Sequence, residues 1–111
     1  MSKITTHVLD VSLGRPAAGI PVMLEARKQD AGWSAVGKGT TDKDGRVTNL
    51  STDARLNPGT YRLTFETAAY LKGKSAFFPQ VTIIFSVEDV SQHYHIPLLL
   101  SPYGYSTYRG S

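Results

Sequence analysis

The sequence of 111 residues contains no cysteine, and this absence excludes a disulfide scaffold and a cysteine nucleophile. No apolar run approaches the roughly 20 residues of a membrane-spanning helix, so we predict no membrane partner. Basic residues exceed acidic ones only by 12 to 9 and form no stripe, which argues against nucleic acid as a partner. Neither a G-x-S-x-G elbow nor a glycine-rich phosphate loop is present, so serine acyl-enzyme chemistry is not indicated.

A chain of this length fits one domain, and we predict a single domain over residues 1–111 without repeats. Hydrophobic residues make up 41% of the chain, but a domain this small gains stability from oligomerisation. Residues 1–7 lack the roughly 7–15-residue apolar core of a signal peptide, so a cytoplasmic location is expected.

Short β-prone segments separated by glycine, proline and aspartate dominate the chain. In the segment 20–27, for example, Ile20, Val22 and Leu24 alternate with other residues and share one face. The segments predicted as strands are 6–11, 20–27, 33–41, 46–50, 60–66, 81–87, 93–100 and 103–108. A short helix is predicted over 67–72, with Thr67 as its cap. About eight strands with at most one helix predict an all-β sandwich or barrel.

Two turn signals punctuate the first half of the sequence. The residues Gly14, Arg15 and Pro16 are predicted to end the first strand. In 42–45, the final Asp-Gly pair supplies the positive φ that a tight hairpin needs, and Arg46 is predicted to begin the strand that leaves this hairpin.

The chain has three histidines, His7, His93 and His95. His93 and His95 are two residues apart, so in a strand they point to the same face. The face that carries His7 meets the face that carries His95 if their strands belong to one sheet. Three histidines could form a zinc site with a fourth position open for water. A solvated or structurally bonded side chain is the commoner role for a lone histidine, and His93, at a strand start, fits that role best.

Five motifs in chain order resemble those of the 5-hydroxyisourate hydrolases, the transthyretin-related enzymes of urate breakdown. They are ITTHVLD at 4–10, GIPV at 19–22, TDKDGR at 41–46, GTY at 59–61 and the C-terminal stretch HYHIPLLLSPYGYSTYRGS at 93–111. In that family the YRGS ending is a signature that transthyretin itself lacks.

The resemblance implies a transthyretin-like β-sandwich that assembles as a homotetramer, a dimer of dimers, with active sites at the dimer–dimer interface. It implies a metal-independent cyclic amidohydrolase without a cofactor. The expected reaction opens the six-membered ring of 5-hydroxyisourate at a cyclic amide bond, giving 2-oxo-4-hydroxy-4-carboxy-5-ureidoimidazoline.

The family motifs match particular residues of this sequence. The match includes His7, Arg46 and His95, and at the position of Arg46 transthyretin-like carriers have an acidic residue. The resemblance also implies that the Ser111 hydroxyl and the terminal carboxylate bond substrate or water. The residues expected to bind substrate or shape the pocket are His7, Arg46, Tyr108, Arg109, Gly110 and Ser111.

The expected chemistry requires an activated water, donors for the developing oxyanion and a proton for the leaving nitrogen. Either His7 or His95 is expected to act as general base in its neutral form, which a nearby Arg46 would favour by like-charge repulsion. The five donors of Arg46 suit the carbonyl groups of a planar purine-like ring.

Two other functions are compatible with this fold. A carrier of thyroxine or another small aromatic ligand could use the same tetramer, but the histidines, Arg46 and the YRGS ending favour the enzyme. An adhesion or structural β-sandwich module explains neither the histidines nor the ending.

Overall fold

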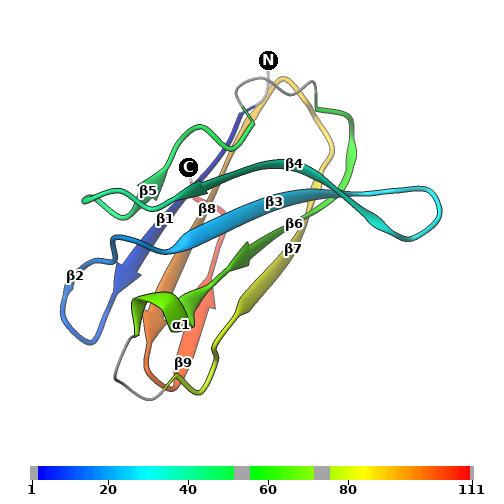
Figure 1. The fold of residues 1–111 in the computed structure, drawn as a ribbon. Coiled ribbons are helices and arrows are strands. Elements are labelled where there is room, and N and C mark those ends of the chain that lie inside the picture. Colours follow the sequence, from blue (N-terminus) through cyan, green and yellow to red (C-terminus); the bar gives the residue numbers. More distant parts are fainter. Residues whose placement is uncertain (1–2, 52–55, 72–75, 111) are drawn as a thin grey trace.

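The protein folds into nine strands and one short helix, and the computed structural model describes residues 3–51, 56–71 and 76–110 (Figure 1). In chain order the elements are β1 (Lys3–Asp10), β2 (Arg15–Pro16), β3 (Pro21–Arg27), β4 (Trp33–Thr40), β5 (Arg46–Val47), β6 (Gly59–Phe65), α1 (Thr67–Tyr70), β7 (Val81–Val87), β8 (His93–Ser101) and β9 (Gly104–Thr107). No helix in the described part of the chain has the length and apolar character needed to cross a membrane.

The strands form two sheets that pack face to face as a sandwich (Figure 1). One sheet has the order β2-β1-β8-β9, with β5 also paired to β1, and the other has the order β4-β3-β6-β7. The predicted all-β sandwich with one short helix is therefore confirmed.

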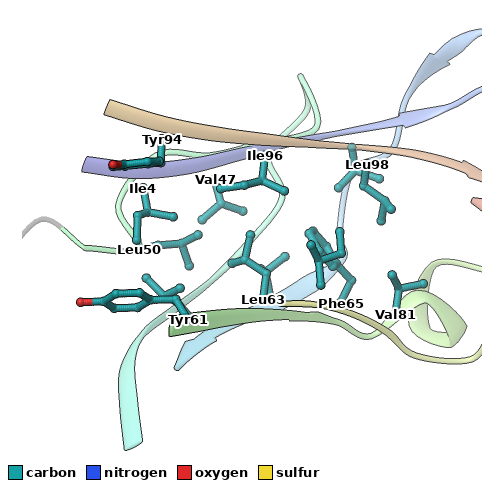
Figure 2. Close-up of a cluster of buried hydrophobic side chains, with 14 of the residues drawn as sticks. Ile4, Val47, Leu50, Tyr61, Leu63, Phe65, Val81, Tyr94, Ile96 and Leu98 are labelled. Atoms are coloured by element: carbon teal, nitrogen blue, oxygen red, sulfur yellow. The ribbon is translucent and has the colours of Figure 1, made fainter. Parts of the chain in front are cut away.

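Alternate residues of both sheets point inward and form one hydrophobic core. Ile4 of β1 and Leu98 of β8 are fully buried and face Leu63 and Phe65 of β6 across the core (Figure 2). Val8 of β1 is fully buried in the same core. Burying apolar side chains in this way is the main favourable contribution to folding. The period-two alternation that buries these residues leaves their sequence neighbours on the outer faces of the sheets.

The first and eighth strands pair in parallel, although they lie near opposite ends of the sequence. Their register sets Thr5 beside His95 and His7 beside Pro97. This pairing brings chemistry-bearing residues of the two chain ends onto one outer face.

Two sequence expectations about the first half were only partly right. The first strand ends at Asp10, before Gly14, but Arg15 and Pro16 do not belong to the break: they pair antiparallel with Asp10 and Leu9 as β2, which accounts for the ninth strand. The predicted turn at 42–45 exists, and Gly45 has φ +76°. It does not close a simple hairpin, however, because β4 pairs with β3 in one sheet while β5 pairs with β1 in the other.

The helix α1 is shorter than predicted, and Thr67 is not its cap. Thr67 is the first helical residue, and Glu66 occupies the cap position without a side-chain hydrogen bond to the helix. The buried Thr67 hydroxyl instead donates to the carbonyl oxygen of Phe78, because the loop before β7 packs over the start of the helix.

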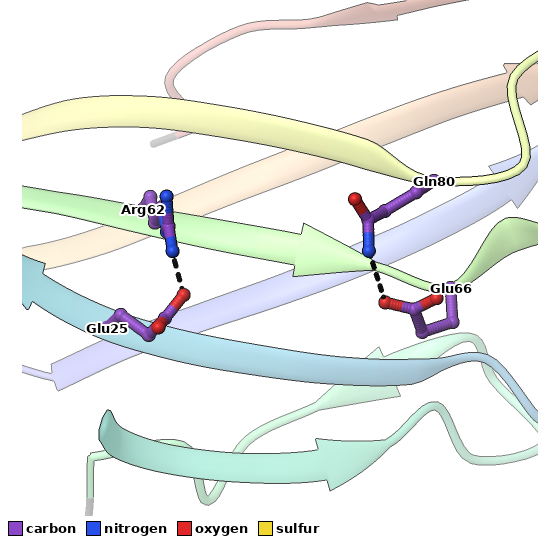
Figure 3. A network of polar contacts seen from close by, with 4 residues as sticks. All are labelled: Glu25, Arg62, Glu66 and Gln80. Atoms are coloured by element: carbon purple, nitrogen blue, oxygen red, sulfur yellow. Dashed lines mark hydrogen bonds and ion pairs between the residues drawn. The ribbon is translucent and has the colours of Figure 1, made fainter. Parts of the chain in front are cut away.

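Several polar side chains on the outer face of the four-stranded sheet, and just beyond the ends of its strands, bond one another. Arg62 donates to Glu25 across β6 and β3 at 2.7 Å, and Gln80 donates to Glu66 at 2.8 Å (Figure 3). The Arg62 guanidinium also lies 4.3 Å from the centre of the Trp33 ring. These contacts involve none of the predicted site residues, which lie on the other sheet or follow it.

Candidate active site

The outer face of β1 and β8 carries a cluster of polar side chains, of which Thr5 is buried and His7 and His95 are half-buried. Thr5 and His7 alternate along β1 with the buried core residues Ile4, Thr6 and Val8, so they point away from the core. The parallel register brings His95 of β8 beside Thr5, and the His7 and His95 ring centres lie 6.5 Å apart. This separation leaves both imidazoles within reach of one small molecule.

The Thr5 hydroxyl connects two of the three histidines. Its oxygen lies 2.8 Å from Nδ1 of His95 and 3.0 Å from Nε2 of His93. The two imidazole centres are 6.4 Å apart, too far for direct contact. Because Thr5 occupies Nδ1 of His95, Nε2 is the nitrogen of that ring left to meet a substrate.

Arg46 joins this face through the short strand β5. Arg46 is directly paired with His7 in the antiparallel register, and directly paired residues project on the same side of a sheet. Gly45 allows β5 to lie this close to β1, because it has φ +76° and carries no Cβ. A Cβ on Gly45 would lie only 2.4 Å from the Val8 carbonyl oxygen, and the Val8 amide donates to Gly45 at 2.7 Å.

The turn before Arg46 is stabilised by a carboxylate. Asp42 Oδ1 accepts hydrogen bonds from the backbone amides of Asp44 at 2.9 Å and Arg46 at 3.0 Å. The Arg46 amide is the main reason that the pKa of Asp42 lies below its ordinary value, and the charges of Arg46 and His7 lower it further. Asp42 therefore remains ionised and fixes the backbone from which the guanidinium extends.

The site favours the neutral form of His95. Burial lowers the pKa of the His95 imidazole, and positive charge on His7, His93 and Arg46 lowers it further. The like-charge effect of Arg46 predicted from the sequence is present, but burial is the larger cause. His95 is thus a neutral base at pH 7.

The C-terminal segment folds back onto His95. The Gly110 amide donates to the His95 carbonyl oxygen at 2.8 Å, and the two residues form an isolated antiparallel bridge. A Cβ on Gly110 would lie 2.7 Å from His95 Cδ2, the carbon bonded to Nε2, so only glycine fits here without a shift. Ser111, the next predicted site residue, lies outside the described residues.

Arg109 and Tyr108 point away from the histidine cluster. The Arg109 guanidinium lies 4.6 Å from the centre of the Tyr94 ring and donates to Gln92 Oε1 at 2.8 Å. Tyr108 lines a pocket of about 240 Å³ together with Ile84 and Phe85 of β7. The structure therefore brings together His7, Arg46, His95 and Gly110, but turns Arg109 and Tyr108 toward the neighbouring edge of the sandwich.

Thr5 is the residue of this site that the sequence interpretation missed. It lies two residues before His7, so the alternation that exposes His7 also turns Thr5 outward. A hydroxyl at that spacing was the available signal. His93 was interpreted as a solvated or structurally bonded side chain, and it is both exposed and hydrogen-bonded to Thr5.

Residues 3–51, 56–71 and 76–110 contain no candidate for the zinc site considered from the sequence. Within those ranges no three histidine, cysteine, aspartate or glutamate side chains are arranged to hold a metal ion. His93 and His95 each direct one ring nitrogen to Thr5.

Comparison with known proteins identifies both the fold and a set of relatives. The model of the HIUase/Transthyretin family matches residues 4–110. A 5-hydroxyisourate hydrolase of Salmonella dublin is 46% identical over 110 residues, which cover 97% of this chain and 80% of that protein.

Two solved structures with different names share the backbone fold of this chain. The 5-hydroxyisourate hydrolase of Klebsiella pneumoniae superposes with a TM-score of 0.86 at 37% identity and full coverage of both chains. Sea bream transthyretin in complex with thyroxine superposes with a TM-score of 0.91 at 31% identity, covering 97% of this chain and 94% of that one. The fold is therefore transthyretin-like, and backbone similarity does not separate a hydrolase from a carrier.

Proposed function

The chain belongs to the HIUase/transthyretin family, and on that basis we propose that it hydrolyses 5-hydroxyisourate in urate degradation. The observation that carries this proposal is the convergence of His7, Arg46 and His95 on one outer face. This set supplies a neutral imidazole, a second imidazole and a guanidinium on one face, and the two imidazole centres lie 6.5 Å apart. Identity to named hydrolases is also higher than identity to the thyroxine-bound transthyretin.

His95 is the base in the proposed mechanism, acting through Nε2. It removes a proton from water while the water oxygen bonds to a carbonyl carbon of the six-membered ring. Its lowered pKa and the hydrogen bond between Thr5 and Nδ1 support this role, because both leave a neutral ring with a defined orientation. The carbonyl becomes an oxyanion, the carbon–nitrogen bond then breaks, and the leaving nitrogen takes up a proton.

Arg46 binds the substrate carbonyls and stabilises the oxyanion in this mechanism. A guanidinium presents its donors in a rigid fork, and such donors are worth most where charge develops. His7 is directly paired with Arg46, so in this mechanism it lies beside the guanidinium as a further group that contacts the substrate. Gly110 lies next to the reactive edge of His95, which supports the expectation for this residue of the YRGS ending, whereas Tyr108 and Arg109 are directed elsewhere.

The reaction as proposed uses water activated by an imidazole and assigns no role to a metal. Activity should therefore survive exhaustive dialysis against a chelator, whereas a metal-dependent enzyme would lose turnover and regain it on metal addition. A cytoplasmic location stays a prediction, which cell fractionation would test.

A homotetramer built as a dimer of dimers is the assembly we propose, with the site at the dimer–dimer interface. Two edge strands support an association of copies. In the described sheets β7 pairs with β6 and β9 pairs with β8, and each leaves its other edge open to a further strand. Exposed Ile84 and Tyr105 lie on these two edges. Sedimentation equilibrium would contradict the assembly if the protein were a monomer at micromolar concentration.

The close backbone similarity to a thyroxine-bound transthyretin supports one alternative, a carrier of a small aromatic ligand. The two functions differ in the role of the histidines, because a carrier needs no base. Calorimetric titration with thyroxine separates them: the enzyme should show weak binding or none. Tight thyroxine binding without hydrolysis would favour the carrier.

Site variants test the proposed hydrolase most sharply. Urate oxidase generates 5-hydroxyisourate in the cuvette, and its decay is followed by ultraviolet absorbance with wild type, His7→Asn and His95→Asn. Each variant should lose about 10²–10⁴-fold in kcat/KM with an unchanged circular dichroism spectrum. Met23→Ala, an exposed change on the other sheet, should match wild type. Near wild-type turnover in both histidine variants would refute the assignment.

A further inference from the structure

We propose that Thr5 is a positioning residue that links His95 to His93, and that this link lets the exposed His93 hold the proton taken from water. The inference rests on the proposed hydrolase function and adds two residues to its machinery. It assigns no contact with substrate to either residue, since both act through His95.

The distances around Thr5 carry the inference. A threonine hydroxyl has one proton, so it can donate to one imidazole nitrogen while it accepts from another. Thr5 Oγ1 lies within hydrogen-bond distance of Nδ1 of His95 and Nε2 of His93 at the same time. In the proposed arrangement the protonation states of the two rings are coupled: His95 Nδ1–H donates to Thr5, and the Thr5 hydroxyl donates to an unprotonated His93 Nε2.

This arrangement leaves Nε2 of His95 free as a base, and it allows a balanced proton transfer. His95 Nε2 accepts a proton from water as the water oxygen bonds to the substrate carbon. The His95 Nδ1–H proton passes to Thr5 Oγ1, while the Thr5 hydroxyl proton passes to His93 Nε2. His95 is then neutral with its proton on Nε2, Thr5 is unchanged, and His93 carries the positive charge.

The return path delivers to the leaving nitrogen a proton in place of the one taken from water. His95 Nε2–H protonates the leaving nitrogen as the carbon–nitrogen bond breaks. Its Nδ1 takes the hydroxyl proton of Thr5, and Thr5 takes the proton from His93 Nε2. All three residues are restored, and the net result is the addition of one water molecule to the substrate.

The surroundings of the two rings favour this direction of transfer. His95 is half-buried and faces positive groups from three strands: His7 on β1, Arg46 on β5 and His93 on β8. His93 is exposed, so water can solvate its charge. Of the C-terminal segment beside His95, Gly110 has no charge, and the Arg109 guanidinium is directed to Gln92 and Tyr94.

Paired substitutions at Thr5 test the link. Thr5→Val keeps the shape of a β-branched side chain and removes the hydroxyl, whereas Thr5→Ser keeps the hydroxyl. We expect kcat/KM to fall about 10²-fold in Thr5→Val, the low end of a general acid–base contribution, and to stay within a few-fold of wild type in Thr5→Ser. Equal activity of Thr5→Val and wild type would overturn the proposal.

The pH profile of His93→Gln separates proton transfer from a purely electrostatic effect. The glutamine can still accept from Thr5 but cannot take a proton. If His93 holds the proton, its own protonation at low pH blocks the wild-type reaction. The acidic limb of kcat/KM should then move to lower pH in His93→Gln, with reduced activity on the plateau. If His93 acts only as a positive neighbour, its removal relieves the lowering of the His95 pKa and moves the limb to higher pH, which would overturn the proposal.

Nuclear magnetic resonance of the imidazole nitrogens tests the coupling without any turnover. In neutral wild-type protein and in Thr5→Ser, both His95 and His93 should carry their proton on Nδ1. In Thr5→Val this correlation should disappear. Protons on Nε2 of both rings in wild type would overturn the proposal. Wild type that lacks hydrolysis but shows the correlated tautomers would refute the proposed function while leaving the coupling intact.

Discussion

The substitution Gly110→Ala tests whether the C-terminal segment must lie against the His95 ring. The added Cβ would start 2.7 Å from His95 Cδ2, while ordinary contact begins at 3.4 Å, so the ring or the segment must shift by about 0.7 Å or more. A shift of the ring stretches its 2.8 Å contact with Thr5, and a shift of the segment breaks the 2.8 Å bond from the Gly110 amide. Either movement disturbs the reactive edge of the base.

The expected effect is on catalysis more than on stability. Misplacement of catalytic groups by about 1 Å can cost roughly 10²-fold, so we expect a 10- to 100-fold fall in kcat/KM. Loss of one backbone hydrogen bond near the surface costs about 1 kcal/mol, which lowers Tm by roughly 4 °C in a domain of this size. The ultraviolet decay assay gives the first quantity, and differential scanning calorimetry gives the second.

Gly104→Ala is the matched control for this substitution. A Cβ at Gly104 would meet only Ser101 Oγ, at 3.7 Å, which is an ordinary contact. Gly104→Ala should retain wild-type kcat/KM. Wild-type activity in Gly110→Ala would refute the reasoning, because the close approach to His95 would then have no catalytic consequence.

Three further predictions concern the guanidinium, a buried carboxylate and the packing of a loop. Arg46→Lys keeps the charge but loses the fork, so kcat/KM should fall about 10²-fold without a change in Tm, because the Arg46 side chain is exposed. Tyr70→Phe removes the 2.6 Å hydrogen bond to Asp10, and urea denaturation should show a loss of about 1.5 kcal/mol at pH 7. Burial and, after it, the bond to Asp10 raise the pKa of Tyr70 to about 12 from 10.0. The wild-type protein should therefore lose this stabilisation as pH rises from 10 to 12, whereas the stability of Tyr70→Phe should not fall for this reason. Gly37→Ala would bring a Cβ to 1.9 Å from the Leu50 carbonyl oxygen. The free energy of unfolding should therefore fall by about 1–3 kcal/mol, which a lower Tm would show.

The strands themselves were largely predictable because their signal is local. The segment 81–87 has the same bounds as β7, and 20–27 differs from β3 by one residue. In both segments the apolar residues recur within a few consecutive positions, so the strand can be predicted without knowing which strand pairs with it. The overall all-β class follows from such segments alone.

Pairing between distant segments was not predictable from local pattern. The strand β5 leaves its neighbour β4 and joins β1 because Gly45 bonds Val8, a contact between residues 37 positions apart. Arg15 and Pro16 looked like part of a break because proline lacks a backbone N–H donor, yet an edge position tolerates that loss. These contacts depend on how the sheets assemble.

The candidate site was predictable in part for the same reason. Sequence motifs indicated His7, Arg46 and His95, and the structure brings them onto one face. The role of Thr5 emerges only from the parallel register that sets it beside His95. The direction of Arg109 is fixed by the Tyr94 ring, which no sequence spacing indicates. The Ser111 side of the site stays a prediction.

The decay of 5-hydroxyisourate with and without the wild-type protein tests the central claim most directly. Urate oxidase supplies the substrate, and the rate is measured at increasing protein concentration. The account predicts acceleration in proportion to protein concentration, with a product that matches hydrolytic ring opening. A decay equal to the spontaneous rate at every concentration would contradict the hydrolase assignment, and would leave the carrier as the function to test.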